Sequence, residues 1–374
     1  MHLSTLSLAV AAALVNVVVS ASNIVVAPYH YFEDDGRDFN LTSYADTTGI
    51  NHYVLAFVTA DYNNKPYWNG WSPIVQKCIS DQANTAIQHI RRKLKGDVAI
   101  AFGGQAGKEF ALVAKDAESL ADTYLSVLHD YDVTWADFDI EGATLLDKPS
   151  VDLRNKAIHL MQQREKIKVS YTLPVNTTHG LDPNGLYLMQ SALKHKVRVD
   201  IVNIMAMDYY EDIPYVDSQG HSLMGHFAIK ATNDTHNQLQ ALYKGTGHLP
   251  SVGVTILPGI NDDVNENITI ADVVQLTTWL KTVDFVSLFS FWNTLADSQG
   301  GYNPWVDGVD WVVTTPYNYS STAVSVLNSK PDKSTTTAAI KSKTTVKPTT
   351  IVKSTTTVNS IADVKPTTST TKAW

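Results

Sequence analysis

The stretch Val-Thr-Trp-Ala-Asp-Phe-Asp-Ile-Glu-Gly, residues 133–142, decides the fold. Its acidic residues Asp137, Asp139 and Glu141 are spaced two apart, with apolar residues between them. In a β-strand this spacing places the three carboxylates on one face, about 6.6 Å apart per two-residue step. Solvated acids on a helix or loop would not need such strict alternation. Gly142 interrupts the strand, so the row points to a strand that ends in an active site.

Seven other apolar segments are predicted to be strands, which gives eight in all. They are residues 24–29, 52–59, 97–102, 166–172, 200–207, 251–256 and 285–292. Amphipathic stretches between them are predicted to be helices, at residues 81–95, after the capping residue Asp116, at 152–163, 186–195, within 223–243 and at 271–281. Strands alternating with helices predict a (β/α)8 barrel, the TIM-barrel form of the α/β class. The alternative, a doubly wound open sheet, needs a glycine-rich turn after its first strand, where residues 30–33 read His-Tyr-Phe-Glu.

Composition is ordinary for a globular protein, with 374 residues of which 44% are hydrophobic. The net charge is −8, but residues 330–374 carry +6 and leave −14 on the rest of the chain. An acidic main body argues against nucleic acid as a partner. The single cysteine, Cys78, excludes an internal disulfide framework and any cysteine-based zinc site.

The first 21 residues resemble a secretory signal peptide. Residues 6–19 are mostly apolar, and Val-Ser-Ala at 19–21 fits the small-residue rule for cleavage. An uncleaved membrane anchor is the alternative, but Asn16 interrupts a run that is already short of the ~20 residues needed to span a bilayer. Five Asn-X-Ser/Thr sequons begin at Asn40, Asn176, Asn233, Asn267 and Asn318. We therefore expect a secreted, glycosylated protein that is extracellular or associated with a cell wall.

The composition changes near residue 329, where Thr, Ser, Lys and Pro become dominant and short pieces repeat. Such a segment cannot bury a core, so residues 329–374 are predicted to be disordered. The predicted domains are therefore a signal peptide at 1–21, a catalytic barrel at 22–328 and a tail at 329–374.

Four motifs, in the same order and on the same strands, resemble the glycoside hydrolases of family 18, the chitinases. They are Asp-Phe-Asp-Ile-Glu-Gly at 137–142, Phe-Gly-Gly at 102–104, Met-Ala-Met-Asp-Tyr at 205–209 and Phe-Trp at 291–292. The similarity covers about residues 23–315. It is greatest to the subgroup typified by bacterial chitinase D, and it indicates a fungal source.

The sequence departs from the family pattern at two positions. Thr134 stands where the family has an Asp, and Ala101 stands where it has a strand-three Ser. In the family that Ser supports the innermost acid by hydrogen bonding. Asp137 must therefore find another donor, for which Thr134 and Tyr171 are the candidates.

The resemblance implies a retaining mechanism in which the substrate's own 2-acetamido oxygen is the nucleophile. Glu141 would be the general acid and then the base. Asp139 would hold the acetamide N–H and share a proton with Asp137, because two close carboxylates resist ionising together. Tyr209 would bond the acetamide oxygen, and Asp208 would contact the sugar or steer Glu141.

The resemblance also implies that Trp292 forms a hydrophobic floor under the reacting sugar. The other predicted substrate-binding residues are Met205, Gly103, Gly104 and Tyr29, with Trp68, Trp71, Tyr210 and Trp305 as further candidates. The implied substrate is chitin or a chito-oligosaccharide. We expect a monomer with no cofactor, no bound metal and no membrane span after signal removal.

Two other classes of protein remain open from sequence. A non-catalytic sugar-binding barrel usually lacks the terminal acid, whereas Glu141 is present. A metal-dependent phosphodiesterase would need His or Asp ligands at neighbouring strand ends, for which His30 is the obvious candidate. Within the family, cleavage of the chitobiose core of N-glycans, the reaction of an endo-β-N-acetylglucosaminidase, is a further alternative.

Overall fold

The computed structural model describes residues 24–32, 39–70, 73–301, 303, 306 and 314–330. The predicted signal peptide lies outside these residues, as do Trp71, Trp305 and all but the first two residues of the predicted tail. No helix in the described part of the chain is long and apolar enough to cross a membrane.

The described residues form a closed parallel barrel. Its strands are β1 Val25–Val26 with β2 Tyr29–Tyr31, then β3 His52–Ala60, β5 Asp97–Gly103, β6 Trp135–Asp139, β7 Lys168–Asn176, β9 Ile201–Met205, β10 Ser251–Ile256 and β13 Val286–Phe291. β1 pairs with β13 and β2 pairs with β3, so the two short pieces together act as the first strand and close the sheet. The predicted (β/α)8 barrel is confirmed.

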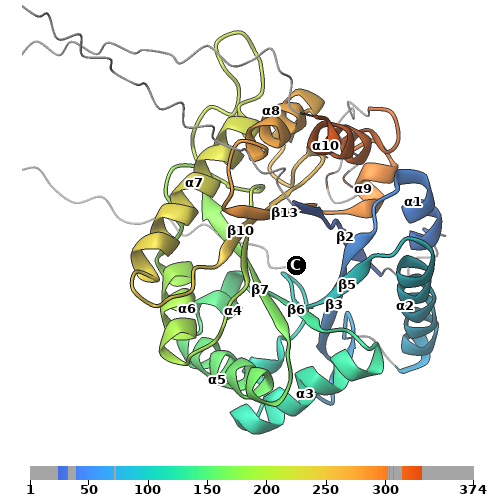
Figure 1. Ribbon diagram of the computed structural model, residues 1–374, viewed down its shortest axis with the longest axis vertical. Helices are drawn as coiled ribbons and strands as arrows, with labels where there is room; N and C mark the ends of the chain where they lie inside the picture. The colour runs from blue at the N-terminus through green and yellow to red at the C-terminus, as the bar shows by residue number, and fades with distance from the viewer. Residues whose placement is uncertain are drawn as a thin grey trace, which may run out of the picture. The chain divides into compact units, whose positions relative to one another are not determined.

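Helices surround the barrel in chain order, as Figure 1 shows by the progression of colour around the ring. The longer ones are α1 Leu41–Thr48, α2 Pro73–Lys93, α3 Ala117–Asp130, α5 Lys148–Arg164, α6 Pro183–Lys194, α7 Met224–Leu242, α8 Ile270–Leu280 and α10 Asn318–Asn328. Each predicted helix is present, and the side chain of Asp116 caps α3 as expected. Helices α1 and α10 were not predicted, and the predicted strand 166–172 begins two residues before β7 does.

Short elements occur in the loops between these strands and helices. They are β4 Pro66–Trp68, the 3-10 helix η1 Phe110–Leu112, α4 Gly142–Leu146, β8 Gly180–Leu181, β11 Gly259–Ile260, β12 Asn267–Ile268 and α9 Thr294–Ser298. Of these, β4 pairs antiparallel with the end of β3, and α4 begins directly after the acid row.

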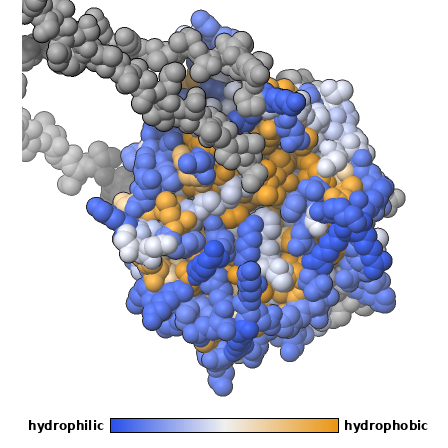
Figure 2. All heavy atoms as spheres, in the orientation of Figure 1, coloured by the Kyte–Doolittle hydropathy of each residue, from blue (hydrophilic) through white to orange (hydrophobic). Residues whose placement is uncertain are grey.

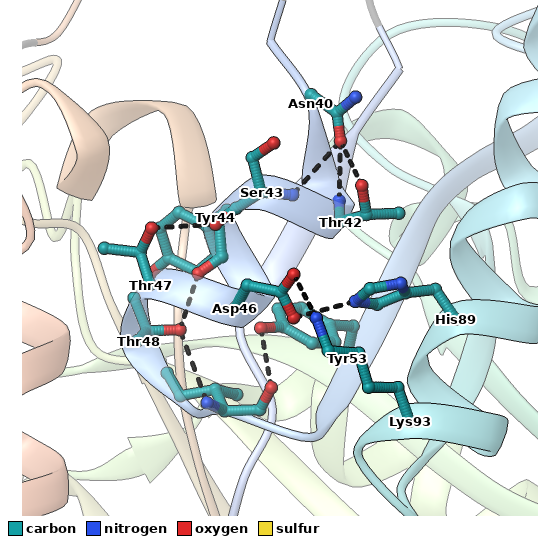
Figure 3. Close-up of polar contacts among 11 residues, drawn as sticks. Asn40, Thr42, Ser43, Tyr44, Asp46, Thr47, Thr48, Tyr53, His89 and Lys93 are labelled. Carbon is teal, nitrogen blue, oxygen red and sulfur yellow. Dashed lines mark hydrogen bonds and ion pairs between the residues drawn. The ribbon is translucent and has the colours of Figure 1, made fainter.

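Helix α1 is held by polar contacts at its start and on its flank (Figure 3). The side chain of Asn40 accepts hydrogen bonds from the backbone N–H groups of Thr42 at 2.9 Å and Ser43 at 3.1 Å, which caps the first turn. The carboxylate of Asp46 contacts His89 at 2.9 Å and Lys93 at 2.7 Å, both on α2. These contacts dock α1 against its neighbour, although its short sequence carries little periodic signal.

Two apolar layers sandwich the strands. The larger layer lies between the sheet and the helices, and a smaller cluster fills the barrel interior with small residues such as Ala99 and Ala101. Figure 2 shows hydrophobic residues gathered toward the middle of the face and mostly hydrophilic residues on the surrounding helices. The small interior residues leave room for the polar side chains that stand on the inward face of β6, β7 and β9.

A buried ion pair ties the loop after β5 to the outer helices. Arg154 on α5 contacts Glu109 at 2.7 Å, and neither side chain is more than 3% exposed. Tyr124 on α3 also donates a hydrogen bond to Glu109, at 2.7 Å. Since the charges are removed from water, each depends on the other for compensation.

We expect Arg154→Met to lower the free energy of unfolding by about 3–5 kcal/mol, because it leaves the Glu109 carboxylate buried without its cation. Urea denaturation measures the change. Adding Glu109→Gln to this variant should recover part of the loss. The control is Lys77→Met, which breaks an exposed pair with Asp81 and should change stability little. A loss for Arg154→Met no larger than that of the control would contradict the assignment.

Candidate active site

The acid row stands on β6 and points into the barrel. Asp137 and Asp139 are 1% and 5% exposed, and Glu141 follows at the start of α4 with an extended backbone. In register across β5, β6 and β7, Ala101 and Ser170 flank Asp137. The predicted alternation is therefore correct, with the three carboxyl groups on one face.

Asp137, the deepest acid, receives hydrogen bonds from three hydroxyl groups. The donors are Ser170 at 2.5 Å, Tyr29 at 2.9 Å and Thr172 at 3.0 Å. Burial raises the pKa of the Asp137 carboxyl from 3.8 to about 6, and the three hydrogen bonds oppose that rise.

The donors predicted from sequence for Asp137 were wrong. Thr134 is exposed, below the start of β6. The hydroxyl of Tyr171 points to the outer face of β7 and donates to Asn155 at 2.6 Å. Because side chains alternate along a strand, the residues on either side of Tyr171, Ser170 and Thr172, face the barrel interior instead. The alternation in the predicted strand 166–172 already placed Ser170 and Thr172 on one face. Only the register of β7 with β6 shows that this face lies beside Asp137.

Asp139 and Glu141 influence each other's ionisation. Burial raises the pKa of both carboxyl groups, that of Glu141 from 4.5 to about 7. The interaction with Asp139 lowers the pKa of Glu141 and that with Glu141 raises the pKa of Asp139, so the two carboxyl groups do not ionise independently. Sequence alone paired Asp139 with Asp137; in the structure both neighbours raise the Asp139 pKa, Glu141 more than Asp137.

Asp208 and Asp262 add two acids beside this row. The backbone N–H of Asp262 donates to Asp208 at 2.8 Å. Burial, followed by the negative charge of Asp262, raises the pKa of Asp208 to about 7. Asp262 also raises the pKa of Glu141, so it faces both groups. The sequence analysis missed Asp262, whose one signal was its position in the loop after predicted strand 251–256.

The structure does not bring Tyr209 to the acid row. Asp208 has a left-handed backbone, φ +46°, which breaks the side-chain alternation that follows β9. The ring of Tyr209 therefore packs against Phe227 on α7, and its hydroxyl lies near Glu266. The next residue, Tyr210, is 63% exposed, and the charges of Asp208 and Asp262 help to raise its pKa. The tyrosine presented to this group of acids is Tyr210.

Gly103 and Gly104 have a backbone role. Their φ angles are +104° and +83°, and Gly104 N–H donates to the carbonyl of Asp139 at 3.0 Å. A Cβ on Gly103 would lie 2.1 Å from that carbonyl oxygen, and one on Gly104 would lie 2.8 Å from the ring of Phe57. Only glycine allows β5 to approach Asp139 this closely.

Aromatic rings form a group at the end of β13. Trp292 stacks on Phe57 at 5.3 Å and lies 5.7 Å from Tyr31 and 5.8 Å from Tyr29, measured between ring centroids. The predicted floor residue Trp292 is therefore next to the acid row, since Tyr29 bonds Asp137. Tyr29 itself is 1% exposed and supports Asp137, which corrects its predicted contact with substrate. Phe57 and Tyr31 were not predicted.

The remaining candidates divide between the site and the periphery. Met205 is half-buried at the end of β9, two residues after the inward-facing Asn203. Trp68 is 1% exposed and packs against Phe32 and Tyr131 outside the barrel, so it is not a sugar-binding residue. The ring of His30 is buried, with Nδ1 3.0 Å from the hydroxyl of Thr294.

In the described part of the chain, no three His, Cys, Asp or Glu side chains are placed to hold a metal ion. Within the acid row, hydroxyl groups hold the innermost member, Asp137. Such a row can donate a proton near neutral pH through Glu141 and keep a negative charge beside the reacting atoms.

Comparison with known proteins gives one consistent result. The model of the family described as glycosyl hydrolases family 18 matches residues 26–243. The chain is 28% identical over 277 residues to a probable bifunctional chitinase/lysozyme of Escherichia coli (strain K12), covering 71% of this chain and 30% of that protein. It is 28% identical over 242 residues to endochitinase 11 of Metarhizium anisopliae, covering 62% and 45%. The chain thus spans less than half the length of these curated relatives.

Two solved structures of a chitinase from Pyrococcus furiosus resemble the fold. The catalytic domain of the hyperthermophilic enzyme superposes with a TM-score of 0.66 at 27% identity, covering 82% of this chain and 96% of that one. Catalytic site mutants of active domain 2, complexed with chito-oligosaccharides, superpose with a TM-score of 0.67 at the same identity and coverage.

We expect Asp262→Asn to lower the pKa of the Glu141 and Asp208 carboxyl groups from about 7, because it removes a negative charge that disfavours their ionised forms. Titration of the ¹³C carboxyl resonances by NMR measures both shifts. The control is Asp212→Asn, an exposed acid in the loop after β9. An unchanged titration of Glu141 in the Asp262 variant would show that Asp262 does not face it.

Proposed function

Since the chain belongs to glycosyl hydrolase family 18, we propose that it is a chitinase that hydrolyses β-1,4 bonds between N-acetylglucosamine units with retention of configuration. The observation that carries the proposal is the pair Asp139–Glu141 at the end of β6, where burial raises the Glu141 pKa to about 7. A carboxyl group with that pKa is protonated often enough near neutral pH to act as a general acid. The relatives named as chitinases support the choice of substrate.

In the first step Glu141 protonates the leaving glycosidic oxygen. The acetamido oxygen of the sugar attacks the anomeric carbon from the opposite side, which forms a cyclic oxazolinium and breaks the glycosidic bond. Asp139 accepts the acetamide N–H, and its negative charge offsets the positive charge that develops on the ring. In the second step Glu141, now ionised, removes a proton from water, which opens the oxazolinium and restores the acid.

Other residues orient the sugar. The indole of Trp292 is half-buried and supported by Phe57 and Tyr31, so its surface suits an apolar sugar face. We assign the hydrogen bond to the acetamide oxygen to Tyr210 in place of Tyr209, because Tyr210 is exposed beside the acids. The presence of Glu141 in a carboxyl pair with a raised pKa favours catalysis over binding alone.

The stereochemistry of the first product tests the mechanism. Hydrolysis of a chito-oligosaccharide of defined length, followed by ¹H NMR, should show the β-anomer before mutarotation, because two displacements at the anomeric carbon retain configuration. A thiazoline mimic of the cyclised sugar should inhibit. Initial appearance of the α-anomer would identify an inverting enzyme, and absence of any turnover would remove the proposed function.

Glu141→Gln tests the role of the acid. We expect the kcat to fall by about 10²–10⁴-fold while substrate affinity is nearly unchanged, because the proton is needed only in the transition state. Glu118→Gln on the outer face of α3 is the matched control and should keep its activity. Near-normal turnover by a folded Glu141→Gln protein would contradict the assignment.

A further inference from the structure

Ser170 occupies an unusual place beneath the acid row. It stands on the inward face of β7, in register with Asp137, and is 1% exposed. Its hydroxyl lies between two partners on β6, the indole Nε1 of Trp135 at 2.9 Å and the Asp137 carboxylate at 2.5 Å. Lys168, the register partner of Trp135 on β7, lies over the indole ring with Nζ 3.5 Å from the ring centroid, a cation–π contact that helps to hold the indole.

The direction of these hydrogen bonds is fixed by the chemistry of the groups. An indole N–H is only a donor, so Trp135 donates to the oxygen of Ser170. The Ser hydroxyl has one hydrogen, and with the indole on a lone pair that hydrogen is directed to Asp137. The two hydrogen bonds therefore have one possible direction: Trp135 donates to Ser170, and Ser170 donates to the Asp137 carboxylate.

The other two donors to Asp137 have no such constraint. The hydroxyls of Tyr29 and Thr172 lie 2.8 Å apart, either can donate to the other, and Asn203 donates to both. On the opposite flank β5 offers no donor, because its register partner is Ala101. Among the described residues, Ser170 is thus the one donor to Asp137 whose hydrogen has a single destination.

We propose that Ser170, oriented by Trp135, is a positioning residue that keeps Asp137 ionised and so leaves the shared proton of the row on Asp139 and Glu141. The inference rests on the proposed function. It also explains how the chain tolerates Ala101. The residue beside Asp137 on β5 has no hydroxyl, and Ser170 on β7 supplies one from the other side of the acid row. The effect of Ser170 on Asp137 is also the largest of those that oppose burial.

The groups that face Asp137 set the expected pH dependence. Asp139 lies beyond it on the same strand, Tyr29 approaches from β2, and β7 supplies Ser170 and Thr172. Without Ser170 the Asp137 pKa rises, so at mildly acidic pH Asp137 takes up a proton. Asp137 then no longer adds its negative charge to the effects that raise the Asp139 pKa, so the protons of the row are redistributed.

The experiment is the pH profile of kcat/KM on a soluble chito-oligosaccharide. In Ser170→Ala the acidic limb should move up by about one pH unit, which lowers the activity about tenfold below the limb and little above it. The KM should change little, because Ser170 lies behind Asp137. Trp135→Phe, which keeps the hydroxyl but frees its hydrogen, should move the limb in the same direction by a smaller amount.

Two further variants separate this role from packing. Ser290→Ala is the matched control, because Ser290 is a buried serine on β13 whose hydroxyl has no partner, and its profile should follow that of the wild type. Ala101→Ser in the Ser170→Ala background returns a hydroxyl beside Asp137 from β5. It should move the acidic limb back toward its wild-type position.

An equal loss of activity at every pH in Ser170→Ala, or a profile that superposes on the wild type, would overturn the inference. Titration of the Asp137 carboxyl by ¹³C NMR reports on the hydrogen bond without turnover. A wild-type protein that fails to cleave the oligosaccharide but whose Asp137 pKa rises in Ser170→Ala would therefore refute the proposed function and leave the hydrogen-bond assignment standing.

Discussion

Burial of Asp137 and Asp139 on β6, with Glu141 partly buried directly after them, is the constraint on which this structure depends. Asp137 and Asp139 are almost completely enclosed, and an isolated buried carboxylate is strongly destabilising. Hydroxyl donors from β2 and β7 surround Asp137, and burial raises the pKa of Asp139 above it, which favours the neutral form of that carboxyl. The small residues of β5 make room for this polar layer. The barrel interior is therefore polar where the chemistry is proposed and apolar elsewhere.

Unusual backbone conformations orient the other residues of the site. The left-handed turn at Asp208 sends Tyr209 to the helices and leaves Tyr210 beside the acids, a conformation that costs free energy for residues with side chains. Gly103, the last residue of β5, and Gly104 allow the chain to bond the carbonyl of Asp139. The backbone at Asp208 and the glycines at 103–104 both determine the orientation of neighbouring side chains. Neither contacts the sugar in the proposed mechanism.

The sequence predicted the barrel because its signals are local: alternation in the acid row, apolar runs for the parallel strands and a cap at Asp116. The contacts of Asp137 were not predictable in this way. Ser170 and Thr172 could be assigned to the inward face only once β7 was placed in register with β6. The exchange of Tyr209 for Tyr210 depends on one backbone angle at Asp208. Asp262 reaches the site through loop geometry that has no periodic pattern.

The same carboxyl groups link activity to stability through pH. Burial raises the pKa of Asp137 to about 6 and that of Glu141 to about 7, so the folded chain keeps protons that the unfolded chain has already released. Their contribution to stability is therefore complete below about pH 4 and is lost as the pH rises through the folded values. The proposed mechanism needs Asp137 ionised and Glu141 protonated, which occur together chiefly between those two values. The acid row is thus active in the pH range in which ionisation of these groups lowers the free energy of unfolding. The apolar layers of the barrel must compensate for this loss of stability.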